Sequence, residues 1–437
     1  MNTHCIKRLT LGLSLGLQLI AVSCRAEALD VNDVSFLWPV PKTAADAEGL
    51  ISLADEASDG PIMPDAIFKA LIDTAKRVPG ISFRTAEFES PKTWKVAGIR
   101  VNPTALGSHP LMLAKAEVPG IRLIVQPVTV GADNKARPHD FSAHVVFNYV
   151  MPVEANQPIK PDKEAFAKIV QDLRQLKTDL NLPVSPTTSQ LNVHPGFSPD
   201  PAVLTGRLKA LLKKHLSSQH LDKHQKGAIS FMGIPGGFEP WVFFKVEVDS
   251  AAGTVTQAAL NGRFGAPQLK QDISFVPDAN GKVLPPPLAP QTVSDASTAS
   301  LFPILPPSQL QNALFPGTTD PKLAHWQNRD IADLVAHPQI TTTISTDCVS
   351  CHTESTRRHL TPGLISQSGT AYPIPAGISG VSPDVLPKDR WNLRNFGWGF
   401  TFDSHPDVAK GFGPTVSQRA ANEAAESAAF INENYKP

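Results

Sequence analysis

The chain has 437 residues, with 40 Lys and Arg residues against 40 Asp and Glu residues. This length suggests two or three domains, and the formal net charge of zero argues against a nucleic-acid binder or a polybasic membrane-surface protein. The 41 Pro residues are roughly twice the usual share of about 5%. Because Pro interrupts helices and sheet ladders, this content excludes a coiled coil and a solenoid of long helices.

The first 28 residues are typical of an export signal. Lys7 and Arg8 form a positively charged start, residues 9–22 are apolar, and residues 26–28 match an A-x-A cleavage site. The apolar run is shorter than the roughly 20 residues that cross a bilayer, and no later stretch is apolar enough to cross one. We therefore expect a periplasmic or cell-envelope protein with no transmembrane span after signal removal.

A second processing route is open in the same region. Residues 20–24 end in Cys24 and resemble a bacterial lipoprotein signal, in which that Cys is lipidated after cleavage. Ala21 stands where such a signal usually has Leu. This route predicts a lipid anchor at Cys24 and an outer-membrane lipoprotein, whereas conventional cleavage releases the chain.

The next part of the chain, residues 29–283, predicts an α+β domain, a mixed domain of helices and strands whose role its residues do not state. Apolar residues at helical spacing predict helices at 64–77, 163–176 and 200–220, the last one capped by Ser198. Runs rich in Val, Ile and aromatic residues predict strands at 94–101, 121–130, 143–150, 229–232, 241–248 and 254–260. The last three strands are expected to form a meander, with a turn at 249–253.

Three His residues follow the helix expected at 200–220 or lie within it. His220 and His224 stand four residues apart, a spacing that can bind a metal, and His215 is nearby. The Lys residues around them favour a solvated surface turn instead.

From residue 284 the composition changes. Residues 284–319 combine Pro clusters with a patch rich in Ser, Thr and Ala, which predicts an extended linker. Residues 320–437 are expected to form a small, mostly α-helical domain that ends in an Ala-rich helix at 417–432. Small residues on one face of this helix favour a close crossing with its neighbour.

Two Cys residues dominate the mature sequence. The other two of the four, Cys5 and Cys24, lie in the signal region, and His352 directly follows the pair Cys348 and Cys351. In a C-x-x-C-H segment, two thiols can each add across a vinyl group of a porphyrin while the His binds the iron. A disulfide, half of a zinc site and a chance match compete with this interpretation. The βαβ context of a redox disulfide and the second Cys/His pair of a zinc site are both lacking in the sequence.

Residues 322–437 resemble the c-type cytochromes through this motif. The Ala-rich helix at the end of the chain is similar to the terminal helix that packs over the haem in the small single-haem class. The resemblance implies a cytochrome c-like domain with one covalently bound haem c, attached at Cys348 and Cys351, and with His352 as the proximal iron ligand.

The sixth iron ligand is open. The small single-haem class usually supplies a Met downstream of the motif, and none of the five Met residues follows His352. His405 and His359 are candidates, Met232 or His325 would approach from upstream, and a vacant position is the remaining alternative.

Basic and aromatic residues after the motif are candidates for the haem surroundings. Arg357, Arg358 and Arg390 are expected to pair with the haem propionates, because guanidinium groups bind carboxylates through two parallel hydrogen bonds. Trp391 and the aromatic residues that follow it would line the porphyrin, or would form a small aromatic core.

Three classes of function are compatible with an exported single-haem protein. Electron transfer, which we favour, needs a six-coordinate iron and a redox partner protein. A haem enzyme or ligand sensor, such as a peroxidase-like protein, needs an open iron and a distal acid or base. Familiar two-haem peroxidases carry two C-x-x-C-H motifs, whereas this chain has one. In a third interpretation, the N-terminal domain is a binding module and the haem is accessory.

Overall fold

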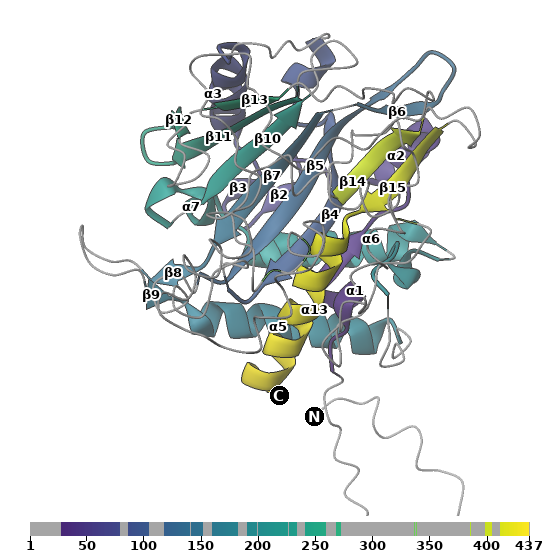
Figure 1. Ribbon diagram of the computed structural model, residues 1–437, viewed down its shortest axis with the longest axis vertical. Helices are drawn as coiled ribbons and strands as arrows, with labels where there is room; N and C mark the ends of the chain where they lie inside the picture. The colour runs from purple at the N-terminus through teal and green to yellow at the C-terminus, as the bar shows by residue number, and fades with distance from the viewer. Residues whose placement is uncertain are drawn as a thin grey trace, which may run out of the picture.

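An antiparallel sheet organises the part of the chain that the structure, a computed structural model, describes (Figure 1). The described residues are 28–78, 86–104, 118–139, 141–151, 160–181, 190–198, 200–225, 227–233, 241–258, 268–271, 336, 338, 385, 398–403 and 411–436. Within them, the sheet has nine strands, seven of which follow the order β1-β4-β5-β7-β10-β11-β12. The other two, β6 and β13, pair with β5 and β11, and every pairing is antiparallel.

The strands of this sheet differ widely in length. They are β1 (Ser35–Leu37), β4 (Trp94–Asn102), β5 (Gly120–Val130), β6 (Ala136–Pro138), β7 (Phe141–Asn148), β10 (Ala228–Gly233), β11 (Trp241–Asp249), β12 (Thr254–Ala258) and β13 (Gln268–Gln271). Three small two-stranded pairs lie outside it. They are β2 (Glu56–Ala57) with β3 (Gly60–Pro61), β8 (Val150–Met151) with β9 (Lys160–Pro161), and β14 (Trp398–Asp403) with β15 (Gly411–Val416).

The helices range from single turns to 17 residues. The α-helices are α1 (Val31–Val34), α2 (Ala44–Gly49), α3 (Asp65–Lys76), α5 (Lys163–Asp179), α6 (Pro201–His215), α7 (Ser218–Leu221) and α13 (Gln418–Asn434). The 3-10 helices are η1 (Ala86–Glu89), η2 (Pro195–Phe197) and η3 (Lys223–Gln225).

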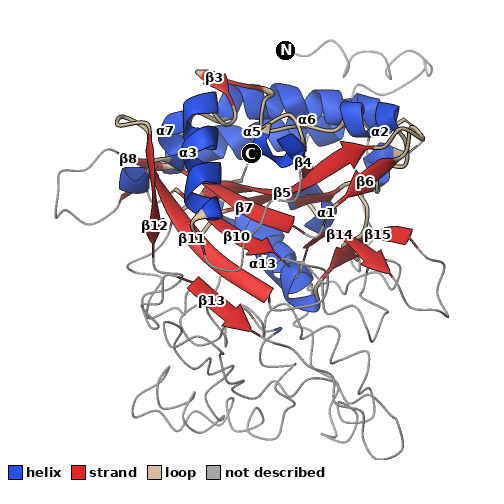
Figure 2. Cartoon of the chain, turned by 90° about the horizontal axis from the view of Figure 1, so that it is seen from above, coloured by secondary structure: helices blue, strands red, loops and turns tan. Residues whose placement is uncertain are grey.

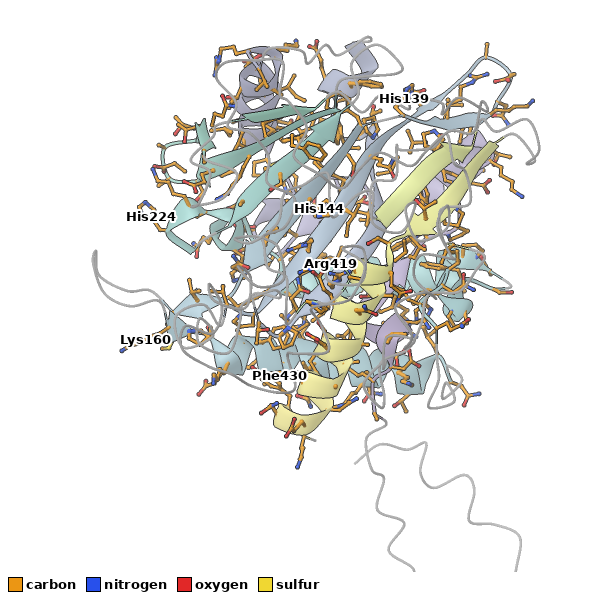
Figure 3. The ribbon with its side chains drawn as sticks, viewed as in Figure 1. His139, His144, Lys160, His224, Arg419 and Phe430 are labelled. Atoms are coloured by element: carbon orange, nitrogen blue, oxygen red, sulfur yellow. The ribbon has the colours of Figure 1, made fainter. Side chains whose placement is uncertain are left out.

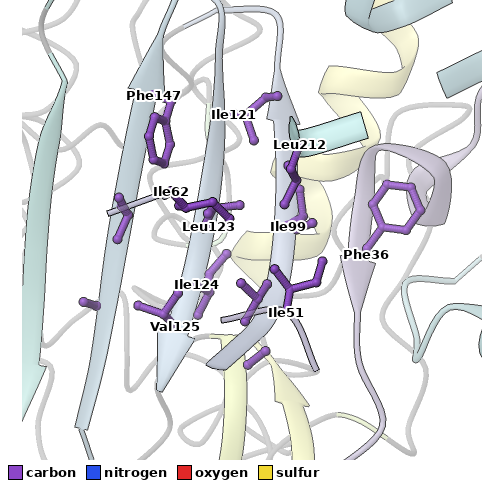
Figure 4. Packing of buried hydrophobic residues seen from close by; sticks show 14 of the residues in the cluster. Phe36, Ile51, Ile62, Ile99, Ile121, Leu123, Ile124, Val125, Phe147 and Leu212 are labelled. Carbon is purple, nitrogen blue, oxygen red and sulfur yellow. The ribbon is translucent and has the colours of Figure 1, made fainter. Parts of the chain in front are cut away.

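One face of the sheet is apolar and lies beneath the helices α3, α5 and α6 (Figure 2). Because side chains of a strand alternate between the two faces, β7 directs Phe141, Ala143, Val145 and Phe147 to the same side. Figure 4 shows Phe147, Ile121, Leu123 and Ile99 of this face beside Ile51, Ile62 and Leu212. All seven are at most 1% exposed, and burying each such side chain contributes about 1.5–3 kcal/mol. This layer is a large part of the core of the described structure, which also includes buried residues of α13 and β14.

The opposite face, which we call the polar face, carries the alternate residues of the same strands. Its polar members include Arg100 of β4, Arg122 and Gln126 of β5, His144 of β7, Ser230 of β10 and Lys245 of β11. The helix α13 and the β14–β15 hairpin lie on this side, against β4 and β5 (Figure 2). Residues near the end of the sequence therefore cover strands near its beginning.

The expected secondary structure is confirmed in most of the described residues. The predicted helices at 64–77, 163–176 and 417–432 correspond to α3, α5 and α13, and Ser417 caps α13 by accepting a hydrogen bond from the Ala420 amide. The meander is confirmed as β10, β11 and β12, with a turn in which Gly253 has a φ of 62°.

One helix differs from its prediction. The segment 200–220 is two helices, α6 and α7, because the backbone is extended at Leu216 and Ser217. The predicted cap at Ser198 is wrong, since the Asp200 side chain accepts the hydrogen bond from the Ala202 amide instead.

The described structure is a mixture of helices and an antiparallel sheet. The division into an N-terminal α+β domain, a linker and a mostly α-helical C-terminal domain remains a prediction. The signal at 1–28, except Ala28, and the linker at 284–319 lie outside the described residues. In the described segments, no helix combines the length and apolarity needed to cross a membrane.

Candidate functional site

Except for Met232 on β10 and the aromatic residues of β14, the residues predicted to hold haem lie outside the described part of the chain. They are Cys348, Cys351, His352, Arg357, Arg358, His359, Arg390, Trp391 and His405. Their roles stay predictions, as does lipidation at Cys24. The structure does describe a surface to which Ala336 and Val385, on either side of the motif in the sequence, are hydrogen-bonded.

Chain positions on either side of the C-x-x-C-H motif are bonded to α13 and β15. The Asn422 side chain donates a 2.7 Å hydrogen bond to the Ala336 carbonyl oxygen. Farther along the chain, the Val416 amide donates to the Val385 carbonyl oxygen at 2.8 Å. Both bonds end on elements that cover the polar face, so the motif is bracketed in sequence by two attachments to one surface.

The β14–β15 hairpin is held on the polar face by one amide side chain. Gln126, fully buried on β5, accepts a 2.6 Å hydrogen bond from the Phe400 amide and donates a 3.0 Å bond to the Phe400 carbonyl. This pairing imitates a backbone ladder between the sheet and β14. Removing the side chain would leave two buried backbone groups without their partner, which makes Gln126 a specific attachment point.

A cluster of charged side chains, which we call the arginine cluster, joins α13 to the sheet. Its members are Arg100, Arg122, Arg419 and Glu423. Arg100, 2% exposed, pairs with Glu423 and donates a 2.8 Å hydrogen bond to the Ala420 carbonyl oxygen. The Arg419 side chain donates from Nε to Glu423 Oε1 at 2.9 Å, one turn farther along α13. Figure 3 shows Arg419 in the first turns of α13, in front of the sheet.

In the arginine cluster, the positively charged groups outnumber the negatively charged ones. Burial lowers the pKa of Arg100 to about 10, partly opposed by Glu423 and reinforced by Arg122 and Arg419. Burial likewise lowers the pKa of Arg122. Burial by itself raises the pKa of Glu423, but the three guanidinium charges outweigh it and hold that pKa below its usual value. At neutral pH, three cations therefore surround one carboxylate.

Arg122 stands apart from the other members of the arginine cluster. It is directly opposite Arg100 in the β4–β5 register, and it is partly exposed. Its Nε atom is buried and has no hydrogen-bond partner in the described structure. A guanidinium in this position has donors to offer to a carboxylate, so the donor set fits an anionic group such as a haem propionate.

The three His residues, whose sequence context favours a surface turn over a metal site, make separate contacts. His215 contacts Asp172, with 2.6 Å between Nε2 and Oδ2, whereas His220 lies 3.1 Å from Ser217 Oγ and packs against Tyr149. No group of three or more metal-ligating side chains occurs in the described ranges. Figure 3 likewise shows His224 well away from His139 and His144. These His residues serve local contacts in the described structure.

Sequence reasoning missed the arginine cluster, although one signal was present. Arg100 and Arg122 both occur inside runs of apolar residues that were correctly predicted as strands. A charged residue there is ordinarily on a solvated face, and only the docking of α13 makes Arg100 buried. Glu423 and Arg419 gave no signal, since charges four residues apart are common on exposed helices.

No protein-family model, curated protein or solved structure matches this chain.

Proposed function

We propose that the protein is an exported single-haem c-type cytochrome that transfers electrons in the cell envelope. The observation that carries the proposal is the C-x-x-C-H segment formed by Cys348, Cys351 and His352, which contains both Cys residues that follow the export signal. The two thiols would attach one haem c covalently, and the imidazole of His352 would bind its iron. The bound haem would supply one-electron chemistry.

The described structure supports this proposal through the surface that it provides. Attachments at Ala336 and Val385 bracket the motif in the sequence, and both lead to elements on the polar face. The Nε atom of Arg122, which has no hydrogen-bond partner among the described residues, adds a donor suited to the carboxylates that haem c carries.

An absorption spectrum of the full chain, matured in a host with cytochrome c assembly machinery, tests the proposal. Sharp α and β bands after dithionite reduction would support a low-spin, six-coordinate haem c and electron transfer. A haem-stained band that survives denaturing electrophoresis would confirm covalent attachment, and Cys351→Ala should weaken it. Cys24→Ser is the matched control, because that Cys lies outside the motif.

Two other spectra would contradict the proposal. A broad high-spin spectrum that shifts with CO would replace electron transfer with a haem enzyme or ligand sensor that has an open iron. The absence of any Soret band would remove the haem and leave Cys348 and Cys351 as a disulfide.

A further inference from the structure

The polar face contains a pairing that the fold alone does not explain. Arg100 and Arg122 occupy directly opposed positions on adjacent antiparallel strands, where like charges destabilise a sheet. Glu423 pairs with Arg100 and Arg419 by direct hydrogen bonds, while its interaction with Arg122 is electrostatic only. The described groups thus leave Arg122 with a charge that no direct hydrogen bond compensates.

The surroundings of Arg122 have the character of an anion site. The side chains of Arg100 and Arg419 are 2% and 7% exposed, whereas Arg122 is partly accessible on the same face. His144, also partly exposed, lies on the adjacent strand β7 and points to the same face, diagonally across from Arg122. The charges of Arg100 and Arg419 act together with that of Arg122 to attract negative charge, and the buried Nε atom of Arg122 has a donor to give.

We propose that Arg122, supported by Arg100 and Arg419, binds a ligand carboxylate, and that this carboxylate is a propionate of the haem. The inference rests on the proposed function for the presence of haem. A guanidinium matches a carboxylate by two parallel hydrogen bonds, whereas a Lys would offer a point charge. Arg122 would act beside the arginines predicted from the sequence, which follow the C-x-x-C-H motif.

The test compares redox titrations of the holoprotein and its Arg122→Gln variant over a range of pH. Removing a positive charge beside a propionate favours the ferric haem, so the midpoint potential of the variant should fall. The ionised form of the propionate should also be less stable, so its pKa should rise. The inflection in a plot of midpoint potential against pH should then move to higher pH. Arg137→Gln is the control, because Arg137 is 49% exposed and pairs with Asp133 on the surface.

An Arg122→Gln variant whose potential and inflection match those of Arg137→Gln would overturn the inference. Should Arg122→Gln fail to fold, Arg122→Lys provides the second variant, since it keeps the charge on the sheet. In this variant the inflection of midpoint potential against pH should also move to higher pH, by a smaller amount than in Arg122→Gln. An inflection at the same pH as in the unsubstituted protein would equally overturn the inference.

A free carboxylate is the other source of the same chemistry, and a separate arm identifies it. If the spectra show no haem, the proposed function fails, and the haemless protein is heated with and without succinate. A rise in melting temperature that Arg122→Gln abolishes and Arg137→Gln retains would overturn the assignment to haem and leave a site for a soluble carboxylate. No rise would overturn the anion site itself.

Discussion

Replacing Glu423 by Gln should destabilise the protein strongly. The side chains of Glu423 and Arg100 are 13% and 2% exposed, so removal of the carboxylate charge leaves a guanidinium almost without solvent. Breaking a buried ion pair from one side costs about 3–5 kcal/mol. The Gln amide retains an acceptor, and Arg100 keeps its hydrogen bond to the Ala420 carbonyl. We therefore expect a loss near the lower end, about 3 kcal/mol in the free energy of unfolding.

Urea denaturation followed by circular dichroism measures this loss, with Glu89→Gln as the matched control. Glu89 pairs with Lys76 at 2.6 Å, but the two side chains are 48% and 42% exposed, and such surface pairs contribute about 0–1 kcal/mol. Because the folded pKa of Glu423 is lowered, its contribution is complete above the unfolded value near 4.3 and disappears as pH falls through the folded pKa. Equal losses for both variants at pH 7 would refute the reasoning.

Three further changes test other parts of the structure. Gln126→Ala should cost about 2 kcal/mol in urea denaturation, because both buried backbone groups of Phe400 lose their partner, and an unchanged midpoint would contradict that attachment. Gly253→Ala should cost about 1 kcal/mol through its φ of 62° alone, since no atom lies within 4 Å of the added Cβ; a stabilised variant would argue against this turn. Burial raises the pKa of Asp33, but hydrogen bonds, including one from Lys177 at 2.6 Å, lower it overall. The stabilisation is thus present above about pH 4 and lost on acidification. Asp33→Asn should therefore flatten the acid limb of a plot of melting temperature against pH. A limb parallel to that of the unsubstituted protein would count against the Asp33–Lys177 pair.

Local pattern was sufficient to find most strands and helices of this fold. In β7, apolar and polar residues alternate from Phe141 to His144, and this period of two identifies a strand with one buried face. In α5, apolar residues recur at helical spacing from Phe166 to Leu173, and the helix buries that stripe. Such signals are contained within one segment, so they need no knowledge of the partner.

The partner of each element was much harder to predict. The Ala-rich face of α13 suits any close neighbour, because small side chains allow an approach to a porphyrin, a helix or a strand equally well. In the described structure, α13 contacts α1 and β4, and Asn432 exchanges two hydrogen bonds with the backbone of Leu29. These contacts join residues about 400 positions apart, which no local periodicity records.

The same limit explains the cap of α6 and the arginine cluster. Ser198 and Asp200 are both competent N-caps two residues apart, and the backbone path that selects Asp200 is set by packing. Arg100 is an ordinary polar residue of a strand until α13 brings Glu423 to it.

The arginine cluster and the C-x-x-C-H motif become evident in different ways. The C-x-x-C-H motif from which we propose a haem is evident in the sequence, whereas the cationic surface exists only in three dimensions. The described groups of that surface include two opposed guanidiniums and one carboxylate, Glu423, which directly pairs with Arg100 but not with Arg122. A haem carries two propionates, so a haem edge at Arg122 would supply the negative charge that these groups lack. The stability of the polar face and the redox potential of the haem should therefore both change when Arg122 is neutralised.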